Sequence, residues 1–379
     1  MKMIYLDNAA TTKMDEMCIN SFIKYGIENF YNPSSLYQPS VEVSRAIKEA
    51  REGLLSLLRG VGGELIFTAS GTEADNMAVF GTRKTKNSRI IISAGEHQAV
   101  NNPALELKQR GFQVDFAPLN NDGSLNILEF TKLLSDDVSF ISIMHVNNET
   151  GAVNDLQQIS KLIRRLSPNA IFHSDGVQAL GKVSINLKAL DVDLYSVRAH
   201  KIHAPKGIGA LDIKDGIRVS PIIFGGGQEK GLRSATENVA SIDAFYQVAK
   251  KVLGNIDEMI LYKKSLLEHL RQRISLELPS AKIISPECSP HILMIALENI
   301  RGEVMMHSLE EFGILTGIGS ACSSKKGISR FKTLLNLDKT HEEGILRISI
   351  DTENTIDELD FFVDKLKIVS NKLTSFKRI

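Results

Sequence analysis

Short apolar runs alternate with helix-like stretches along the first two-thirds of the chain. The apolar runs have polar residues on both sides, which is typical of strands buried in a parallel sheet. The stretches between them repeat apolar residues with the period of a helix. This alternation predicts an α/β fold, with a mostly parallel sheet covered by helices on both faces. The predicted strands are Glu64–Thr68, Arg89–Ser93, Gln113–Ala117, Val138–Met144, Ala170–Ser174 and Asp193–Val197, and the predicted helices include Thr72–Gly81, Ala99–Arg110 and Leu156–Leu166.

The pattern changes near Glu237. A long amphipathic stretch, Val239–Leu278, predicts one or two helices that lead out of the first domain. We expect a smaller α+β unit after it, with the domain boundary near residue 255. Its predicted elements are a strand at His291–Ala296, a helix at Val304–Phe312, a strand at Leu346–Ile350 and a final helix at Ile356–Leu373.

Composition removes several classes of function. The 379 residues are 43% hydrophobic and carry a formal net charge of +0, so the chain can bury a large core but has no charge excess to attract nucleic acid or an anionic membrane. No apolar run approaches the ~20 residues that span a bilayer. The N-terminus lacks the basic start and apolar stretch of a signal peptide. We therefore expect a soluble, cytoplasmic protein.

The three cysteines, Cys18, Cys288 and Cys322, are too few and too scattered for a disulfide framework or a metal site. Cys18 reads as a buried apolar residue, and Cys288 as a loop residue without a role. Cys322 differs, because it lies in a small polar loop, residues 317–327, next to lysines. A thiol on such an exposed loop suits a nucleophile.

Ligands of open α/β sheets bind beyond the carboxyl ends of the strands, so the polar segments that follow the predicted strands are candidate binding segments. In Ala69–Glu73, small residues precede a helix, which would offer free N–H groups to a phosphate, with the hydroxyl of Thr72 in addition. Ordinary N-capping of the helix explains the same residues. The segment alone therefore leaves both interpretations open.

Two later segments carry a carboxylate and a lysine. Asp175 ends a predicted strand and would keep the nitrogen of a bound pyridine ring protonated, although an Asp here also suits a helix N-cap. Lys201 stands between His200 and His203 and is a candidate for a Schiff base, since burial near other cations would lower the pKa of its amine. Lys206 is the competing lysine, but a solvated turn explains it better.

These segments, in this order, resemble those of the cysteine desulfurases, which belong to the class-V aminotransferases and to fold type I of the pyridoxal-phosphate enzymes. The long Ser-Ala-Cys-Ser-Ser loop is similar to that of the subgroup that serves general iron–sulfur assembly. The resemblance runs nearly end to end, through Tyr5–Thr12, Asn32–Ser35, Glu96–His97, Asn147–Gly151, Asp175 with Gln178, His200–Lys201, Gly225–Glu229, Arg233–Asn238, Ser320–Cys322 and Arg347.

The resemblance implies a large domain, residues 15–255, with a mostly parallel seven-stranded sheet. A small domain would combine residues 1–14 and 256–379. The implied cofactor is pyridoxal 5′-phosphate, held by Lys201 as a Schiff base, and no metal is implied. Other residues implied to hold the cofactor are Asp175 at the pyridine nitrogen, Gln178 at the phenolic oxygen, His97 on the ring and, at the phosphate, Gly71, Thr72, His200 and Thr236.

The implied substrate is L-cysteine. Arg347, assisted by Asn148, would bind its carboxylate, as arginine geometry favours. Lys201 and His97 would act as acid and base, and Cys322 would attack the substrate sulfur, which gives a persulfide and alanine. Thr236 would reach the site of a neighbouring subunit, which implies a homodimer. The implied protein partner is a sulfur acceptor, such as an iron–sulfur scaffold, a tRNA-thiolation enzyme or a DNA-modification system.

The sequence departs from the family pattern around the cofactor. The family usually has serine three residues before the Schiff-base lysine, and this chain has Arg198. Arg198 would either contact the phosphate or point away from it. Ala204 and Ala235 replace usual glycines, which is costly where φ is positive, and Tyr37 replaces a usual histidine.

Other interpretations stay open at this point. A selenocysteine lyase, or another β-eliminating lyase of the same fold, would share most of these residues. A non-catalytic protein that binds sulfur acceptors would keep the fold alone, but the presence of Lys201, Asp175, His97, Cys322 and Arg347 together argues against it.

Overall fold

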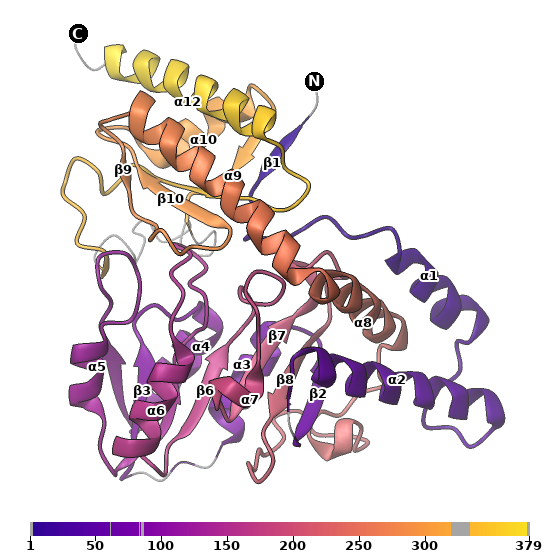
Figure 1. Ribbon diagram of the computed structural model, residues 1–379. Coiled ribbons are helices and arrows are strands. Elements are labelled where there is room, and N and C mark those ends of the chain that lie inside the picture. Colours follow the sequence, from indigo (N-terminus) through magenta and orange to yellow (C-terminus); the bar gives the residue numbers. More distant parts are fainter. Residues whose placement is uncertain (1–2, 61, 83, 85–86, 320–333, 377–379) are drawn as a thin grey trace.

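A seven-stranded sheet forms the larger body of the molecule (Figure 1). The computed structural model describes residues 3–60, 62–82, 84, 87–319 and 334–376. All neighbouring strands are parallel except at β8, Gly209–Ile213, which runs antiparallel to both of its neighbours. The predicted, mostly parallel sheet is therefore confirmed. In order across the sheet, the strands are β2 (Glu64–Thr68), β8, β7 (Leu194–Arg198), β6 (Ile171–Asp175), β5 (Val138–Ser142), β3 (Arg89–Ser93) and β4 (Gln113–Ala117).

Helices cover both faces of this sheet, as the sequence pattern predicts. Successive side chains of a strand point to opposite faces, so Leu65 and Phe67 join one apolar core and Ile66 joins the other. The first core is closed by α2 (Gln38–Leu57), α5 (Ile127–Leu133), α6 (Leu156–Leu166), α7 (Leu187–Leu190) and α8 (Val239–Gly254), and the second by α3 (Gly71–Gly81) and α4 (Gln98–Gln109).

The predicted bounds agree closely with the structure. The bounds of α6 match, and β6 and β7 each begin and end one residue later than expected. Predicted β5 extends to Met144, but the strand ends at Ser142. β8 has no counterpart in the prediction.

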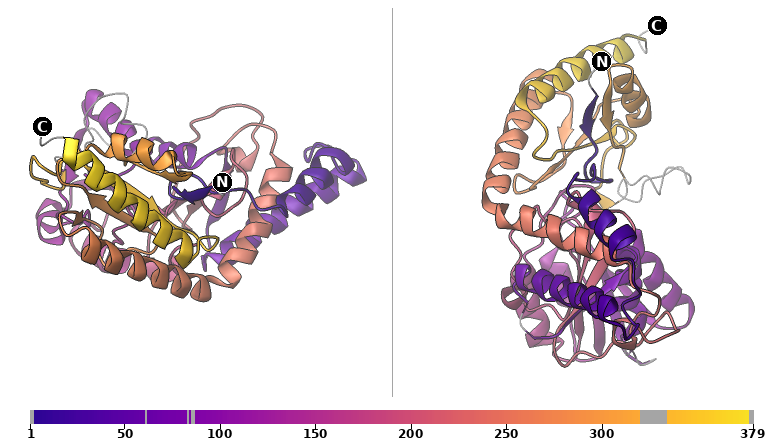
Figure 2. Two further views of the ribbon diagram at one scale, coloured as in Figure 1. Left: turned by 90° about the horizontal axis from the view of Figure 1, so that it is seen from above. Right: turned by 90° about the vertical axis from the view of Figure 1, so that its right-hand side faces the viewer.

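A smaller body lies above the large sheet (Figures 1 and 2). Its antiparallel sheet has β10 (Ile292–Ala296) between β9 (Lys282–Ile283) and β12 (Ile345–Ser349). Three helices pack on it, α9 (Ile256–Glu277), α10 (Gly302–Glu310) and α12 (Ile356–Phe376). The predicted helical stretch is thus two helices, α8 and α9, which run one after the other from the large body into the small one (Figure 2).

The N-terminus returns to this smaller body. Strand β1, Ile4–Leu6, pairs in parallel with β11, Ile314–Thr316. Ile4 and Leu6 belong to the apolar core that α9, β10, β12 and α12 enclose. We propose that residues 1–14 and 256–379 form the small domain and residues 15–255 the large one, because Asn255 separates α8 from α9.

The remaining elements are short. They are α1 (Cys18–Ile23), a π-helical turn at Lys24–Glu28 and 3₁₀ turns at Ala199–Lys201 and Glu229–Gly231. In the described ranges, no helix is both long and apolar enough to cross a membrane.

Candidate active site

The candidate residues gather at one edge of the large sheet. Asp175 is the last residue of β6, Arg198 is the last residue of β7, and the turn that holds Lys201 follows directly. The N-terminus of α3 comes just after β2, which runs in the direction of β7. Carboxyl ends of parallel strands meet at one edge, so these segments form a common site.

Lys201 is the buried lysine of this site. Its Nζ donates hydrogen bonds to the carbonyl oxygens of Ala9 and, at 2.8 Å, Ala10. Burial, together with the nearby cations Arg347 and Arg198, lowers the pKa of the amine to about 7, against the opposing charges of Asp7 and Asp175. A large share of the amine is therefore uncharged near neutral pH and able to attack a carbonyl. Lys206, the competing lysine, is exposed.

Asp175 is a buried carboxyl group that forms no direct ion pair with another described residue. One of its oxygens accepts a hydrogen bond from the backbone N–H of Val177 at 2.8 Å. Burial, together with the neighbouring carboxyl group of Asp75, raises the pKa of Asp175 to about 7. A protonated ring nitrogen beside Asp175 would stabilise its charged form.

Gln178 lies beside Lys201. Its Nε2 donates to the Ala9 carbonyl at 2.8 Å, the same oxygen that accepts from Lys201, and its Oε1 faces Nε2 of His291 at 3.0 Å. His291 is buried, and burial holds its pKa well below the usual range, so its ring is neutral. The two bonds fix which end of the Gln178 amide carries the donor.

Arg347 is the residue that the small body contributes to the site. It lies in β12, and its two terminal nitrogens donate at 2.8 Å to the Asn148 carbonyl and to a carboxylate oxygen of Asp7. Its Nε is buried and has no partner among the described residues. The Asn148 amide itself donates to Glu149 at 2.8 Å. The guanidinium of Arg347 thus already holds a carboxylate, that of Asp7.

The N-terminus of α3 and His200 together make a cradle for an anion. Gly71 is the first residue of α3, and a Cβ there would come within 2.8 Å of Val177. His200 is 5% exposed, and its Nδ1 lies 2.9 Å from the Thr11 hydroxyl, while its Nε2 has no partner in the described part of the chain. Thr72 is exposed at the same helix end. This unsatisfied ring nitrogen and the helix end fit the phosphate of pyridoxal phosphate.

Three predicted residues are less closely tied to this network. His97 precedes α4, and its Nδ1 accepts from the Ala99 N–H at 3.1 Å, which caps the helix. Thr236 is exposed, and no hydrogen bond of the described residues joins it to the site. Cys322 lies outside the described residues.

The two alanines at usual glycine positions differ in backbone conformation. Ala204 does not have a positive φ, so the expected cost is absent there. Ala235 has φ 154°, within the range that favours glycine, so the cost falls on this residue, next to Thr236.

Sequence reasoning missed the buried acid Asp75 and the role of the N-terminal backbone. Asp75 lies on α3, and burial raises its pKa to about 7. A charged residue between the buried Ala74 and Ala78 is a visible signal for it. The carbonyls of Ala9 and Ala10 leave no such signal, because any residue supplies one.

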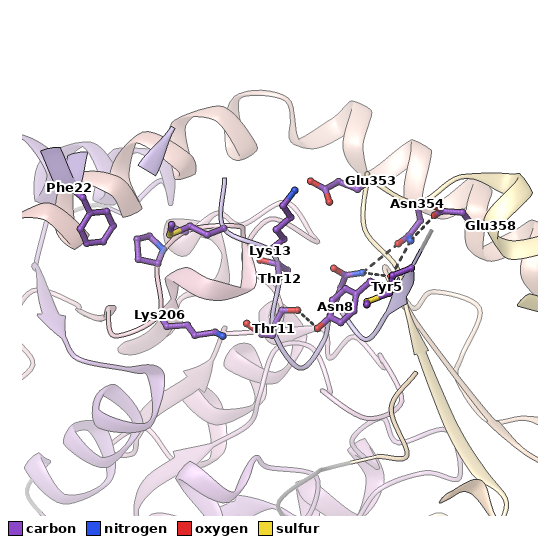
Figure 3. A pocket seen from close by; sticks show the side chains of 14 residues that line it. Tyr5, Asn8, Thr11, Thr12, Lys13, Phe22, Lys206, Glu353, Asn354 and Glu358 are labelled. Atoms are coloured by element: carbon purple, nitrogen blue, oxygen red, sulfur yellow. Dashed lines mark hydrogen bonds between the residues drawn. The ribbon is translucent and has the colours of Figure 1, made fainter. Parts of the chain in front are cut away.

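A pocket of about 900 Å³ opens beside the network (Figure 3). Fourteen residues line it, among them Thr11, Lys206 and Glu353, and the described candidate residues are not among them. It adjoins the site through Thr11, which contacts His200. The candidate site itself lies where the N-terminal segment meets the large sheet, since the Ala9 and Ala10 carbonyls accept hydrogen bonds from Lys201.

Comparisons with known proteins agree with this geometry. Residues 4–362 match the family "Aminotransferase class-V". The cysteine desulfurase IscS of Clostridium botulinum is 33% identical, over 98% of this chain and 95% of the relative. A solved NifS-like protein superposes with a TM-score of 0.90 at 30% identity, covering 99% of this chain and 100% of that one.

A second solved structure, that of SspA in complex with cysteine, has a TM-score of 0.79 at 25% identity, covering 92% of this chain and 99% of that one. The family match spans almost the whole chain, and the resemblance of the motifs is confirmed by relatives of nearly equal length. The chain therefore belongs to the class-V aminotransferase family and, within it, to the cysteine desulfurases.

Proposed function

We propose that this protein is a pyridoxal-phosphate-dependent cysteine desulfurase, which converts L-cysteine to L-alanine and passes the sulfur to Cys322. The observation that carries the proposal is the proximity of a buried lysine, Lys201, whose pKa is lowered to about 7, to the carboxyl group of Asp175 and the guanidinium of Arg347. An amine, an acid for a ring nitrogen and a carboxylate binder are the groups that the reaction of an amino acid with this cofactor requires.

The cofactor fits the unsatisfied groups of the site. Bound pyridoxal phosphate would supply an electron sink for the bond that breaks at the substrate. Asp175 would hold its ring nitrogen in the protonated state, and Gln178 would donate to its phenolic oxygen. His97 would lie on the ring. The N–H groups of Gly71 and Thr72, with His200, would hold the phosphate.

Lys201 has the role of proton carrier. With a pKa of about 7, its amine takes up a proton from the substrate α-carbon and returns one to the product without a large energetic cost. The Ala9 and Ala10 carbonyls keep the amine in place during this exchange.

Arg347 would bind the carboxylate of L-cysteine. Asp7 occupies one of its terminal nitrogens, so the substrate would replace Asp7 and gain a two-pronged ion pair. The solved relative SspA, which holds cysteine, supports this choice of substrate.

Cys322 is the proposed acceptor of the sulfur. The segment that leads to it begins beside the substrate site, since Gly317 and Arg347 exchange two backbone hydrogen bonds, of 2.9 and 2.7 Å. The Cys322 thiolate would attack the substrate sulfur, and the electrons of the broken C–S bond would remain on carbon. One proton, equivalent to that lost by the Cys322 thiol, completes the methyl group, and Lys201 returns to the α-carbon the proton that it removed, so that one cysteine and one thiol give one alanine and one persulfide.

The test is a single turnover with L-cysteine. We expect alanine and a persulfide in equal amounts, with the extra sulfur mapped by mass spectrometry to Cys322 and not to Cys18 or Cys288. Formation of pyruvate and free sulfide would instead favour a β-eliminating lyase. Alanine without sulfur on Cys322 would contradict the proposed acceptor. A selenocysteine lyase would act on selenocysteine while leaving cysteine unchanged.

The protein partner would be a sulfur acceptor, either an iron–sulfur scaffold or a tRNA-thiolation enzyme. We also propose a homodimer, in which Thr236 reaches the phosphate in the partner's site. Exposed apolar residues between α1 and α2 support an interface on this face, because such residues mark surfaces that a partner covers. Ile27 is 70%, Phe30 66% and Leu36 97% exposed.

Shared sites can be tested by mixing two inactive or weakened variants. Thr236→Ala should raise the dissociation constant of the cofactor by about 10–100-fold, the value of a hydrogen bond to a charged group. Lys201→Ala should be inactive. A mixed dimer has one site with both wild-type residues only if Thr236 acts across the interface. Activity at limiting cofactor should therefore return on subunit exchange, and no recovery would contradict the sharing.

A further inference from the structure

Arg198 lies directly against the phosphate cradle. It is the last residue of β7, three positions before Lys201. A Cβ built on Gly71 would meet the Arg198 side chain at 3.4 Å from its Cβ and 3.5 Å from its Cδ. The stem of Arg198 therefore packs on the first residue of α3, where the helix presents its free N–H groups.

The guanidinium of Arg198 has no direct ionic partner in the described part of the chain. Its Nε is buried, and no hydrogen bond or ion pair with any residue of the described ranges engages it. Asp75 and Asp175 are close enough for their charge to act on it, but neither reaches it as a partner. An arginine keeps its charge in proteins, so this arrangement lacks an anion.

Neighbouring groups point to the same missing anion. The N-terminus of α3 carries the positive end of the helix dipole. Burial, with Lys201, Arg198 and Lys206 nearby, lowers the pKa of His200 to about 3, so its ring is neutral. When the Thr11 hydroxyl donates to Nδ1, the unpartnered Nε2 of His200 carries the ring proton and can donate it.

We propose that Arg198 binds the phosphate group of the cofactor directly, in place of the serine hydroxyl that is usual in the family. This inference rests on the proposed function and adds a charged ligand to its site. A guanidinium offers a planar pair of donors to a phosphate, where a hydroxyl offers one. The same cation is close enough to Asp75 and Asp175 to interact with their charges, which would offset part of the repulsion between these acids and a phosphate.

The experiment compares two ligands that differ only in the phosphate. Apoprotein of the wild type, Arg198→Ser and Arg198→Lys is titrated with pyridoxal phosphate and with pyridoxal, with equilibrium dialysis as the readout. We expect Arg198→Ser to raise the dissociation constant of pyridoxal phosphate about 10–100-fold and that of pyridoxal by less than about twofold. Arg198→Lys keeps the charge and should recover part of the loss. Inorganic phosphate should compete less well in Arg198→Ser than in the wild type.

Each outcome bears on the proposal. Equal pyridoxal-phosphate affinity of wild type and Arg198→Ser would overturn it, and so would an equal loss for both ligands, which would mean that Arg198 only supports the fold. Arg198→Gln, which keeps most of the length without the charge, replaces the serine variant if that variant does not fold. If the wild type itself forms no lysine-bound cofactor, the proposed function fails, whereas tight binding that ignores Arg198 overturns this inference alone.

Discussion

Replacing Lys201 with alanine should abolish alanine formation from L-cysteine and remove the absorbance band of the lysine-bound cofactor. The loss of proton transfer alone accounts for a fall in kcat of about 10²–10⁴-fold. The covalent bond between the protein and the cofactor is lost as well. No other described lysine takes the position of Lys201, whose amine donates to the Ala9 and Ala10 carbonyls. The measurement is alanine production together with the absorbance spectrum.

Lys206→Ala is the matched control for this variant. It removes the same charge five residues away, but the side chain is exposed, so the spectrum and the turnover should stay close to those of the wild type. A band that survives Lys201→Ala and disappears in Lys206→Ala would reverse the assignment.

The pKa of Lys201 sets a pH dependence for the same step. Below about pH 7 the amine is mostly protonated and cannot attack the cofactor, and above it the amine is free. The rate at which apoprotein captures pyridoxal phosphate should therefore rise with pH through about 7 and then level off. A midpoint near the ordinary lysine pKa of about 10.4 would show that the site does not lower the pKa of Lys201.

Asp175→Asn should produce the second large loss, a fall in kcat of about 10²–10⁴-fold. The amide has no negative charge to keep the ring nitrogen protonated, and removing one partner of a buried charge pair costs about 3–5 kcal/mol, or roughly two to four factors of ten. The free energy of unfolding should change much less than kcat. Burial already disfavours the charged form of Asp175 in the cofactor-free protein, so the neutral amide should cost little free energy of unfolding.

The control for this variant is Asp212→Asn. Asp212 lies in β8, which β7 separates from the strand of Asp175. It is buried and has a pKa that burial raises to about 7, but it is not a site residue. We expect normal kcat in Asp212→Asn and near-normal urea midpoints for both variants. A loss of activity in Asp175→Asn that only follows a loss of folding would refute the electrostatic role.

The sequence predicts the parallel strands well because most of them are rich in buried apolar residues and are followed by a helix. β8 breaks that rule. It follows β7 without an intervening long helix, contains the polar Asp212 and begins with Gly209. The position of β8 requires that the backbone of Gly209 lies very close to that of Ser70, since a Cβ on Gly209 would lie 2.8 Å from the backbone carbonyl carbon of Ser70. No pattern within the strand itself reveals that contact.

The candidate site also has features that the sequence predicts and features that it does not. Side chains with distinctive chemistry, such as Lys201, Asp175 and Arg347, stand out by type and by position after strands. The environment that tunes them depends on residues far away in the chain, and the pKa of Lys201 depends partly on Arg347. Such long-range charge effects arise only when the chain folds. The contact between Arg198 and Gly71 belongs to this second group as well.

The pairing of β1 with β11 has a consequence for the order of events during synthesis. Ile4 can pair with Ile314 only after Ile314 has been synthesised. At about 5–20 residues per second, the ribosome needs roughly 15–60 s to reach Ile314 after Ile4. Until then, Ala9, Ala10 and Thr11, just beyond β1, are not anchored by their strand, although they contact Lys201 and His200 in the finished molecule. Lys201 is thus made in mid-chain, but the strand that anchors its carbonyl partners can pair only near the end of translation. A nascent chain therefore has little capacity to capture an aldehyde before it is complete.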